Sequence, residues 1–231
     1  MKSINFIKMN GAGNDFILID SQKHSELSLN KDLIISLCNR RKGIGADGIL
    51  VIRPSANYDY ELEYYNSDGS IGSLCGNGAR CSIKYVFSKM NSDKKEISFL
   101  CNHQVYSGSK FDNELFTFHL NEPADIALDK PIRNRNNSLL YNFADTGSPH
   151  VVFIWDEIKT TFDQDFNDFD IYTFGKQIRY HEEFMPNGTN VNVVHINNSI
   201  FIRTYERGVE EETLACGTGT VASAIIIYKK F

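Results

Sequence analysis

The feature that most constrains this chain is a short pattern that occurs twice, once in each half of the sequence. One copy reads Leu74-Cys75-Gly76-Asn77-Gly78-Ala79-Arg80-Cys81-Ser82, and the other reads Ala215-Cys216-Gly217-Thr218-Gly219-Thr220-Val221-Ala222-Ser223. Apolar residues at helical spacing follow each copy, so each cysteine is expected at a helix N-terminus. Unpaired N–H groups and the helix dipole stabilise a thiolate there, so we expect thiols that ionise more readily than a free cysteine, whose pKa is about 8.5. Two such sites predict paired thiols that share one substrate.

The order of predicted strands and helices also repeats between the halves. In the first half, residues 4–7 and 16–19 predict strands on either side of the glycine-containing turn 10–15. Residues 30–41 predict a helix that ends at Gly43. Further strands are expected at residues 49–52, 60–65, 97–101 and 105–107.

In the second half, strands are expected at residues 115–120, 151–155, 191–196 and 200–205, with a connecting loop at 129–137 and a helix at 170–184. We place the domain boundary near Asn113. Residues 1–113 then form an N-terminal half that carries Cys75, and residues 114–231 form a C-terminal half that carries Cys216. The expected architecture is two similar α+β halves, with the cysteine helices facing each other across a cleft, because domain interfaces often hold small ligands.

Composition and charge exclude several classes of partner. The chain has 231 residues, of which 42% are hydrophobic, enough for one large domain or two ordinary ones. With a net charge of −5 and a sequence pI near 5.7, it offers no general attraction for nucleic-acid phosphates. Residues 1–9 lack the apolar core of a signal peptide, and no apolar run approaches membrane-spanning length. We therefore expect a soluble cytoplasmic protein without nucleic-acid or membrane partners.

The five cysteines favour reduced thiols over disulfides or metal. Their number is odd, no two form a C-x-x-C pair, and no cysteines or histidines have the short spacing of a zinc finger or ribbon. We expect no metal site. Cys38, Cys81 and Cys101 lie among apolar neighbours and are interpreted as buried fillers. Cys75 and Cys216 differ from them because glycines follow both.

Seven segments occur in this order along the chain: Gly11-Ala12-Gly13-Asn14-Asp15-Phe16, Gly45-Ala46-Asp47-Gly48, Asn66-Ser67-Asp68-Gly69-Ser70, Cys75-Gly76-Asn77-Gly78-Ala79-Arg80, Gly147-Ser148-Pro149-His150, Gly188-Thr189-Asn190-Val191, and Tyr205-Glu206-Arg207-Gly208 with Cys216-Gly217-Thr218-Gly219. Taken together, over nearly the whole chain, they resemble the diaminopimelate epimerase family of cofactor-independent amino-acid racemases. The resemblance implies two pseudo-symmetric α+β domains, each a mixed or antiparallel sheet around a central helix, and no cofactor. It also implies a role in lysine and peptidoglycan-precursor synthesis, and a homodimer. Relatives continue beyond the second cysteine helix, so strands that close the second domain are expected to be missing here.

The chemistry implied by the resemblance is stereoinversion of LL-2,6-diaminopimelate to the meso form. A proton must leave one face of the α-carbon and return on the other, which a thiolate and a thiol on opposite faces achieve as base and acid. The resemblance implies that Cys75 and Cys216 are that catalytic pair. The N–H groups at Gly76-Asn77 and Gly217-Thr218 would hold the α-carboxylate and stabilise the carbanion.

The resemblance also assigns the remaining site residues. Taken alone, these side chains are more often turn residues, a structural histidine or a solvated ion pair. By resemblance, the substrate-binding set is Asn14, Asn66, Asn190, Glu206 and Arg207, with His150 and Glu206 tuning the two thiols.

Two substitutions separate the chain from the usual family pattern, and three other functions remain open. Gly48 stands where many members have glutamine, and Ser148 where the usual motif has asparagine, so contacts to the distal end of the substrate are expected to differ. The alternatives are a related racemase acting on proline or hydroxyproline, a catalytically silent ligand-binding or scaffold protein, and a thiol-redox protein. The absence of C-x-x-C disfavours the last.

Overall fold

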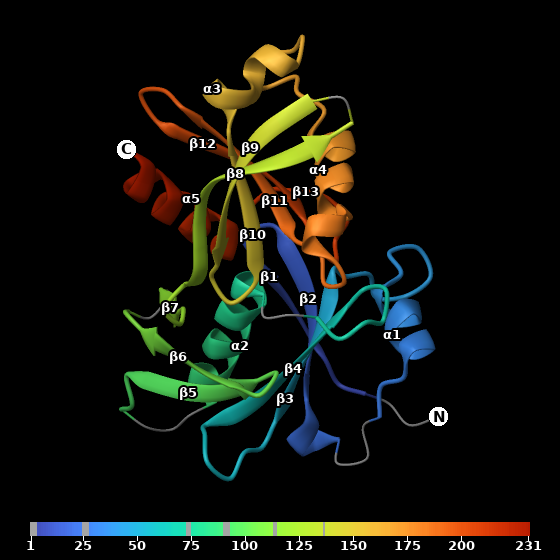
Figure 1. Ribbon diagram of the computed structural model, residues 1–231. Helices are drawn as coiled ribbons and strands as arrows, with labels where there is room; N and C mark the ends of the chain where they lie inside the picture. The colour runs from blue at the N-terminus through green and yellow to red at the C-terminus, as the bar shows by residue number, and fades with distance from the viewer. Residues whose placement is uncertain (1–3, 25–27, 73–74, 90–92, 113–114, 136) are drawn as a thin grey trace. The chain divides into compact units, whose positions relative to one another are not determined.

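The computed structural model describes residues 4–24, 28–72, 75–89, 93–112, 115–135 and 137–231, and the chain divides into two compact units (Figure 1). Unit 1 is Met1–Asn121 and unit 2 is Glu122–Phe231. Each unit is built around one β-sheet with helices on both of its faces. Within the described ranges, no helix combines the length and apolar character that crossing a membrane requires.

The sheet of unit 1 has seven strands in sequential order, β1 to β7. The pairs β2–β3 and β4–β5 are parallel, and the others are antiparallel. The elements of this unit are β1 (Ile7–Gly11), β2 (Asn14–Asp20), the short 3₁₀ helix η1 (Ser21–Lys23), α1 (Lys31–Cys38), β3 (Gly48–Arg53), β4 (Tyr60–Asn66), α2 (Gly76–Lys89), β5 (Glu96–Cys101), β6 (Gln104–Lys110) and β7 (Phe116–His119).

The helices α1 and α2 cover opposite faces of this sheet. Successive residues of a strand point to opposite faces, and in β2 both sets are buried. Leu18 packs in one core cluster with Ile83 of α2, whereas Ile17 and Ile19 pack in another with Ile34 of α1. This explains why the apolar run at the centre of β2 is continuous and not alternating.

The sheet of unit 2 has six strands in the order β13-β12-β11-β10-β9-β8. The pair β10–β11 is parallel, and the others are antiparallel. Its elements are β8 (Ala124–Asn134), β9 (Asn137–Asp145), β10 (Pro149–Ile154), α3 (Trp155–Ile158), η2 (Lys159–Thr161), α4 (Ile171–Arg179), η3 (Glu182–Phe184), β11 (Asn190–Ile196), β12 (Ile200–Glu206), β13 (Glu211–Thr213) and α5 (Gly217–Lys230).

Opposite faces of this second sheet are covered by α4 and α5. Phe153 of β10 packs in a cluster with Phe174 of α4, while its neighbour Val152 packs in another with Ala222 of α5. Trp155, the single tryptophan of the chain, is buried in the α4-side cluster, with its ring 5.0 Å from that of Phe169. Burying each large apolar side chain stabilises the fold by roughly 1.5–3 kcal/mol.

The two units repeat one supersecondary pattern. In unit 1, β1-β2-β3-β4 pair in the sequence antiparallel, parallel, antiparallel, and in unit 2 β9-β10-β11-β12 do the same. The parallel pair is connected through α1 in unit 1 and through α4 in unit 2, and a cysteine helix, α2 or α5, follows further along the chain. The predicted α+β fold with two pseudo-symmetric halves is confirmed.

Two sequence-based assignments around the junction were wrong. The strand expected at 115–120 does not open the second half, because β7 pairs with β6 and completes the first sheet. The division between the units therefore follows β7, whereas the residues at the expected boundary, 113 and 114, lie outside the described ones. The loop expected at 129–137 is instead the end of β8 and the start of β9, because its polar residues alternate with buried ones such as Ile132.

Candidate active site

Cys75 lies immediately before α2, the position that the sequence predicts for it. Its carbonyl oxygen accepts a hydrogen bond from the N–H of Ala79 at 2.7 Å, the first bond of the helix. Its sulfur accepts from the N–H of Gly78 at 3.5 Å. Cys75 is partly exposed, so the thiol combines an N–H donor of the first helical turn with access from outside unit 1.

The side chains of Asn77 and Asn14 meet beside Cys75. Asn77 is buried, and its Nδ2 donates to Oδ1 of Asn14 at 2.5 Å. The Nδ2 of Asn14 in turn donates to Oδ2 of Asp47 at 3.3 Å, and the Arg80 guanidinium donates to Oδ1 of Asn77. These bonds fix the orientation of both amides.

Charged side chains hold the loop that carries Asn14. Arg40 donates to Asp15 at 2.7 Å and to Asp47 at 2.6 Å, and Lys8 forms an ion pair with Asp15 at 2.7 Å. Burial acts to raise the pKa of Asp15, but the hydrogen bonds from Arg40 and Lys8 outweigh it and hold that pKa well below its usual range. The sequence analysis did not identify Arg40 and Asp47 as parts of the site.

Asn66 lies at the end of β4, opposite Gly48 at the start of β3. Its Nδ2 donates to Oγ of Ser70 at 3.0 Å, across a tight turn. The backbone at Gly48 leaves no room for a side chain, because an added Cβ would lie 2.6 Å from both the Tyr65 carbonyl oxygen and the Tyr64 ring. The close packing around residue 48 therefore accounts for the glycine there. This reason is separate from the substrate contact that a glutamine at this position would supply.

Cys216 caps α5 at the equivalent place in unit 2, but it is almost fully buried, with 8% of its surface exposed. Its sulfur lies 3.5 Å from Oγ1 of Thr218. Burial and the negative charge of Glu206 raise the thiol pKa to about 12, although hydrogen bonds from Thr218 and Gly219 lower it. The expectation of a readily ionised thiol was wrong for Cys216, because desolvation outweighs the helix N-terminus.

His150 is fully buried in β10 and connects to Cys216 through Thr218. Its Nε2 lies 2.9 Å from Oγ1 of Thr218 and 3.2 Å from Oγ of Ser148, and its Nδ1 lies 3.1 Å from Nδ2 of Asn192. Burial, assisted by the positive charge of Arg207, lowers the pKa of His150 to about 3. The imidazole is therefore neutral at physiological pH.

Asn190 connects this cluster to Arg207. Its Nδ2 donates to Oγ of Ser148 and to the carbonyl oxygen of Pro149, both at 2.9 Å, and its Oδ1 accepts from the backbone N–H of Arg207 at 2.9 Å. Burial lowers the pKa of the Arg207 guanidinium, whose Nη1 donates to the Asn187 carbonyl oxygen at 3.2 Å. Asn190 therefore holds the backbone at Arg207 in place.

Glu206 lies at the end of β12, beside Arg207. Its Oε2 accepts a hydrogen bond from Oγ1 of Thr213 at 3.0 Å, and its charge acts on the Cys216 thiol. Gly217 and Thr218 form the first residues of α5, as Gly76 and Asn77 do in α2.

Each unit thus gathers its own share of the predicted residues around one cysteine. Asn192 was missed by the sequence analysis, although its spacing of two from Asn190 in a buried strand indicates two amides on one face. Unit 1 groups Cys75, Gly76, Asn77 and Asn14, with Asn66 two strands away at the same end of the sheet; unit 2 groups Cys216, Gly217, Thr218, His150, Asn190, Glu206 and Arg207.

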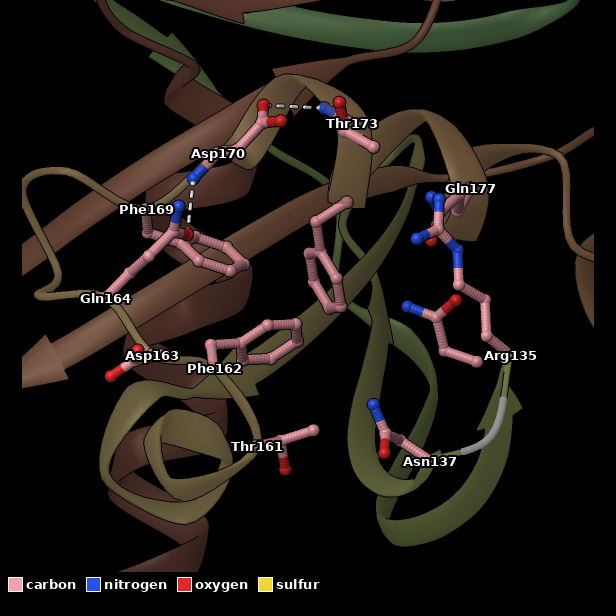
Figure 2. Close-up of a pocket in the computed structure, with 12 residues that line it drawn as sticks. Arg135, Asn137, Thr161, Phe162, Asp163, Gln164, Phe169, Asp170, Thr173 and Gln177 are labelled. Atoms are coloured by element: carbon pink, nitrogen blue, oxygen red, sulfur yellow. Dashed lines mark hydrogen bonds between the residues drawn. The ribbon is translucent and has the colours of Figure 1, made fainter.

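One cavity lies within each unit. One, of about 440 Å³, opens in unit 2 between the β8–β9 hairpin, the segment after α3 and the start of α4, and Figure 2 shows Phe162 and Phe169 beside Asp170 and Gln164 there. The other, of about 520 Å³, is lined by residues of β1, α2 and β7 in unit 1, including Lys8 and Lys84. The described lining of neither cavity contains a predicted site residue.

Comparisons with known sequences match most of the chain to one family. A family model described as diaminopimelate epimerase matches residues 6–105 and 142–230. The diaminopimelate epimerase of Chlorobaculum tepidum is 36% identical over 226 residues, which cover 96% of this chain and 82% of the relative. That of Flavobacterium psychrophilum is 37% identical over 220 residues, covering 94% of this chain and 79% of the relative.

Solved structures with low sequence identity share the fold. A hydroxyproline epimerase from Agrobacterium vitis, with bound trans-4-OH-L-proline, aligns with a TM-score of 0.69 at 11% identity, covering 98% of this chain and 77% of that one. A PhzF-family phenazine biosynthesis protein from Bacillus anthracis aligns with a TM-score of 0.68 at 13% identity, covering 100% of this chain and 83% of that one.

Proposed function

This chain belongs to the diaminopimelate epimerase family, and from that premise we propose that it converts LL-2,6-diaminopimelate to the meso form with Cys75 and Cys216 as its two acid–base groups. It is an isomerase, as the relatives it matches are. The family match carries the proposal, and the placement of both cysteines at equivalent helix starts supports it.

The chemistry requires a proton to leave one face of the α-carbon and another to arrive on the opposite face. One thiolate removes the proton while the opposing thiol donates one, and the two groups exchange roles in the reverse reaction. Burial keeps Cys216 protonated before substrate binds, which suits it to donate. Cys75, which is partly exposed and accepts an N–H bond from the first turn of α2, is suited to begin as the base.

Substrate binding is proposed to use the starts of both helices. The N–H groups around Gly76-Asn77 and Gly217-Thr218 would hold the α-carboxylate and stabilise charge as the carbanion forms. Arg207 would bind a carboxylate in a bidentate manner, because its guanidinium presents two parallel donors. Asn14, Asn66 and Glu206 would bind the amino and carboxylate groups, and Asn190 would contribute by holding the backbone of Arg207.

His150 and Glu206 are proposed to tune the thiols. His150 acts on Cys216 through Thr218, as the distances of 2.9 and 3.5 Å support, and Glu206 acts through its charge. We further propose that the enzyme is cytoplasmic, dimeric, and active in lysine and peptidoglycan-precursor synthesis, which rests on the family alone.

The test is incorporation of deuterium at the substrate α-carbon. Fully reduced protein is incubated with LL-diaminopimelate in heavy water, and exchange and inversion are followed by mass spectrometry and chiral chromatography. We expect both in the natural protein. Cys75→Ala and Cys216→Ala should each lose inversion, because each removes one of the two proton-transfer groups. Cys38→Ala is the matched control, since Cys38 is a buried thiol of α1 and should be dispensable.

Other outcomes would point to the rival functions. Folded protein that binds diaminopimelate without any exchange would indicate a silent binding protein. Exchange of proline or hydroxyproline in place of diaminopimelate would indicate a racemase with a different specificity. Inversion that survives either cysteine substitution would contradict the two-thiol mechanism.

A further inference from the structure

A buried series of hydrogen bonds crosses the sheet of unit 2 and ends at the sulfur of Cys216. It begins at Thr204 on β12, passes through Asn192 on β11 and His150 on β10, and reaches Thr218 in the first turn of α5. All five side chains are buried. Because each of these groups has a defined donor or acceptor capacity, the direction of each bond can be deduced.

The orientation of the Asn192 amide is fixed by two partners other than His150. Its Nδ2 lies 3.0 Å from the carbonyl oxygen of Val151, which can only accept, and its Oδ1 lies 2.9 Å from Oγ1 of Thr204, which donates. The nitrogen that lies 3.1 Å from Nδ1 of His150 is therefore the amide donor. It follows that Nδ1 accepts and carries no proton.

A neutral imidazole without a proton on Nδ1 carries it on Nε2. This N–H has two hydroxyl oxygens within reach, Thr218 at 2.9 Å and Ser148 at 3.2 Å, and the shorter contact is the one to Thr218. As an acceptor from His150, Thr218 keeps its own hydroxyl proton for another partner. Among the described residues, the remaining contact of that hydroxyl is the sulfur of Cys216, at 3.5 Å.

We propose that Asn192 is a positioning residue of this site: it selects the Nε2–H tautomer of His150 and thereby directs the hydroxyl proton of Thr218 toward the sulfur of Cys216. The catalytic consequence rests on the proposed function, whereas the directions of the hydrogen bonds do not. A donor aimed at the sulfur stabilises the thiolate that forms whenever Cys216 gives up its proton.

The charged groups that act on this series have fixed and opposite signs. Glu206 opposes ionisation of Cys216, and Arg207 opposes protonation of His150. The series therefore stabilises a thiolate without introducing a buried positive charge, which would be costly to desolvate. This differs from a cysteine–histidine ion pair, in which the imidazole must be protonated.

Gly219 shows how closely the helix approaches this series. An added Cβ at this residue would lie 2.5 Å from Oδ1 of Asn192 and 3.3 Å from the sulfur of Cys216. Contacts under 3.0 Å do not occur for real Cβ atoms, so the backbone of α5 lies directly against Asn192. Asn192 thus contacts both the histidine and the turn that carries the cysteine.

The first experiment compares the full chain with its Asn192→Asp variant, without substrate. An aspartate has nearly the same shape but accepts where the amide donates, so His150 should switch to the Nδ1–H tautomer. Long-range ¹H–¹⁵N spectra of the six histidines report the tautomer, and His150→Gln assigns the signal. We expect Nε2–H in the natural protein and Nδ1–H in the variant.

The second readout is the reactivity of Cys216, measured as iodoacetamide alkylation of its peptide against pH. Without the Thr218 donor, the thiolate fraction at a given pH should fall about tenfold, since hydrogen bonds to charged groups stabilise them by about 1.5–3 kcal/mol. Asn142→Asp is the matched control. Asn142 is equally buried, and its Nδ2 also donates to a β10 carbonyl, that of Val152, but among the described residues its side-chain hydrogen bonds are to Asp129 and Val152 and not to His150.

An Nδ1–H tautomer in the natural protein, or equal tautomers and equal Cys216 reactivity in both proteins, would overturn the proposal. If Asn192→Asp does not fold, the Thr218→Val and Thr218→Ser variants provide the test. The valine variant should reproduce the tenfold loss of Cys216 thiolate, and the serine variant, which keeps the hydroxyl, should not. Equal effects of the two substitutions would contradict the proposed series of hydrogen bonds. Diaminopimelate exchange is measured separately, so absence of the proposed function cannot be mistaken for failure of this inference.

Discussion

The starts of α2 and α5 share a backbone pattern but differ in their surroundings. In each, the residue two positions after the cysteine contacts a side chain near the start of a strand of the parallel pair: Asn77 contacts Asn14 of β2, and Thr218 contacts His150 of β10. Around Cys75 the next partners are charged and partly exposed, such as Asp47. Around Cys216 they are neutral and buried, such as Asn192.

This difference shows which properties a repeated fold preserves. The shared strand order places the helix start, its N–H groups and one contacting side chain at the same point in each unit. It does not fix the dielectric environment of the sulfur, which depends on burial and on side chains from neighbouring strands. Two thiols with equivalent backbone positions can therefore lie in environments that favour ionisation to different degrees.

The largest effect that would distinguish the two helix starts is expected for glycine substitutions. Gly219→Ala should destabilise unit 2 by about 2–3 kcal/mol, because the new methyl group overlaps Asn192 and overpacking is costly. Gly78→Ala, at the equivalent position of α2, should cost under about 1 kcal/mol, because its nearest contact is Cδ2 of Leu50 at 3.1 Å, a flexible side chain. Amide hydrogen exchange in each sheet measures the loss of stability caused by each substitution. Equal losses in the two units would contradict the expected difference between the two helix starts.

The second expected difference between the two units is their loss of stability in acid. The pKa of His150 falls from 6.5 to about 3 on folding, so its contribution to stability is fully present above pH 6.5 and is lost as the pH falls toward 3. Between pH 7 and 5, unit 2 should lose about 2 kcal/mol. The pKa of Asp15 is also depressed, from an ordinary 3.8, so unit 1 should weaken only below that pH.

Hydrogen exchange of the β10–β11 and β2–β3 amides at pH 7 and pH 5, corrected for intrinsic rates, measures the stability of each unit separately. His150→Gln is the control, because it removes the titrating group and should abolish the additional loss in unit 2. Equal weakening of both sheets in the natural protein would show that burial of His150 does not set this acid sensitivity.

The smallest effect is expected at equivalent serines seven residues after each cysteine. Ser82→Ala should cost about 1 kcal/mol, because its Oγ lies 2.8 Å from the Tyr60 hydroxyl in a buried hydrogen bond. Ser223→Ala should be neutral or slightly stabilising, since the Oγ of Ser223 is buried and has no hydrogen-bond partner among the described residues. Urea unfolding measures the free energy of unfolding of both variants. A greater loss of stability for Ser223→Ala than for Ser82→Ala would contradict this prediction.

Local patterns predicted the parts of this structure that depend on local chemistry. The glycines after Cys75 and Cys216 predicted both helix starts, and the duplicated order of elements predicted two similar units. The residues around the cysteines that were missed, such as Asp47 just before β3 and Asn192 on β11, lie far away in the sequence from the cysteines or on neighbouring strands. The acidity of Cys216 was also missed, because burial is a property of the whole unit and cannot be deduced from the residues next to the cysteine.

The assignment of strand β7 failed for a related reason. Its residues predict a strand correctly, but periodicity does not say which sheet a strand joins. Similarly, the asparagines near residue 134 suggested a loop, yet Asn134 is buried and pairs with Asn137 in a hairpin. Pairing partners are tertiary information, and neither composition nor spacing contains it.

The position of Trp155 makes the two units optically distinct. It is the single tryptophan of the chain, and it lies in the aromatic cluster of unit 2, with rings such as Phe169 beside it. Its fluorescence emission should therefore shift when unit 2 opens, whereas a denaturation curve recorded at tryptophan wavelengths would not report the opening of unit 1. Where circular dichroism and tryptophan emission give different midpoints, the difference measures how independently the two halves of this enzyme unfold.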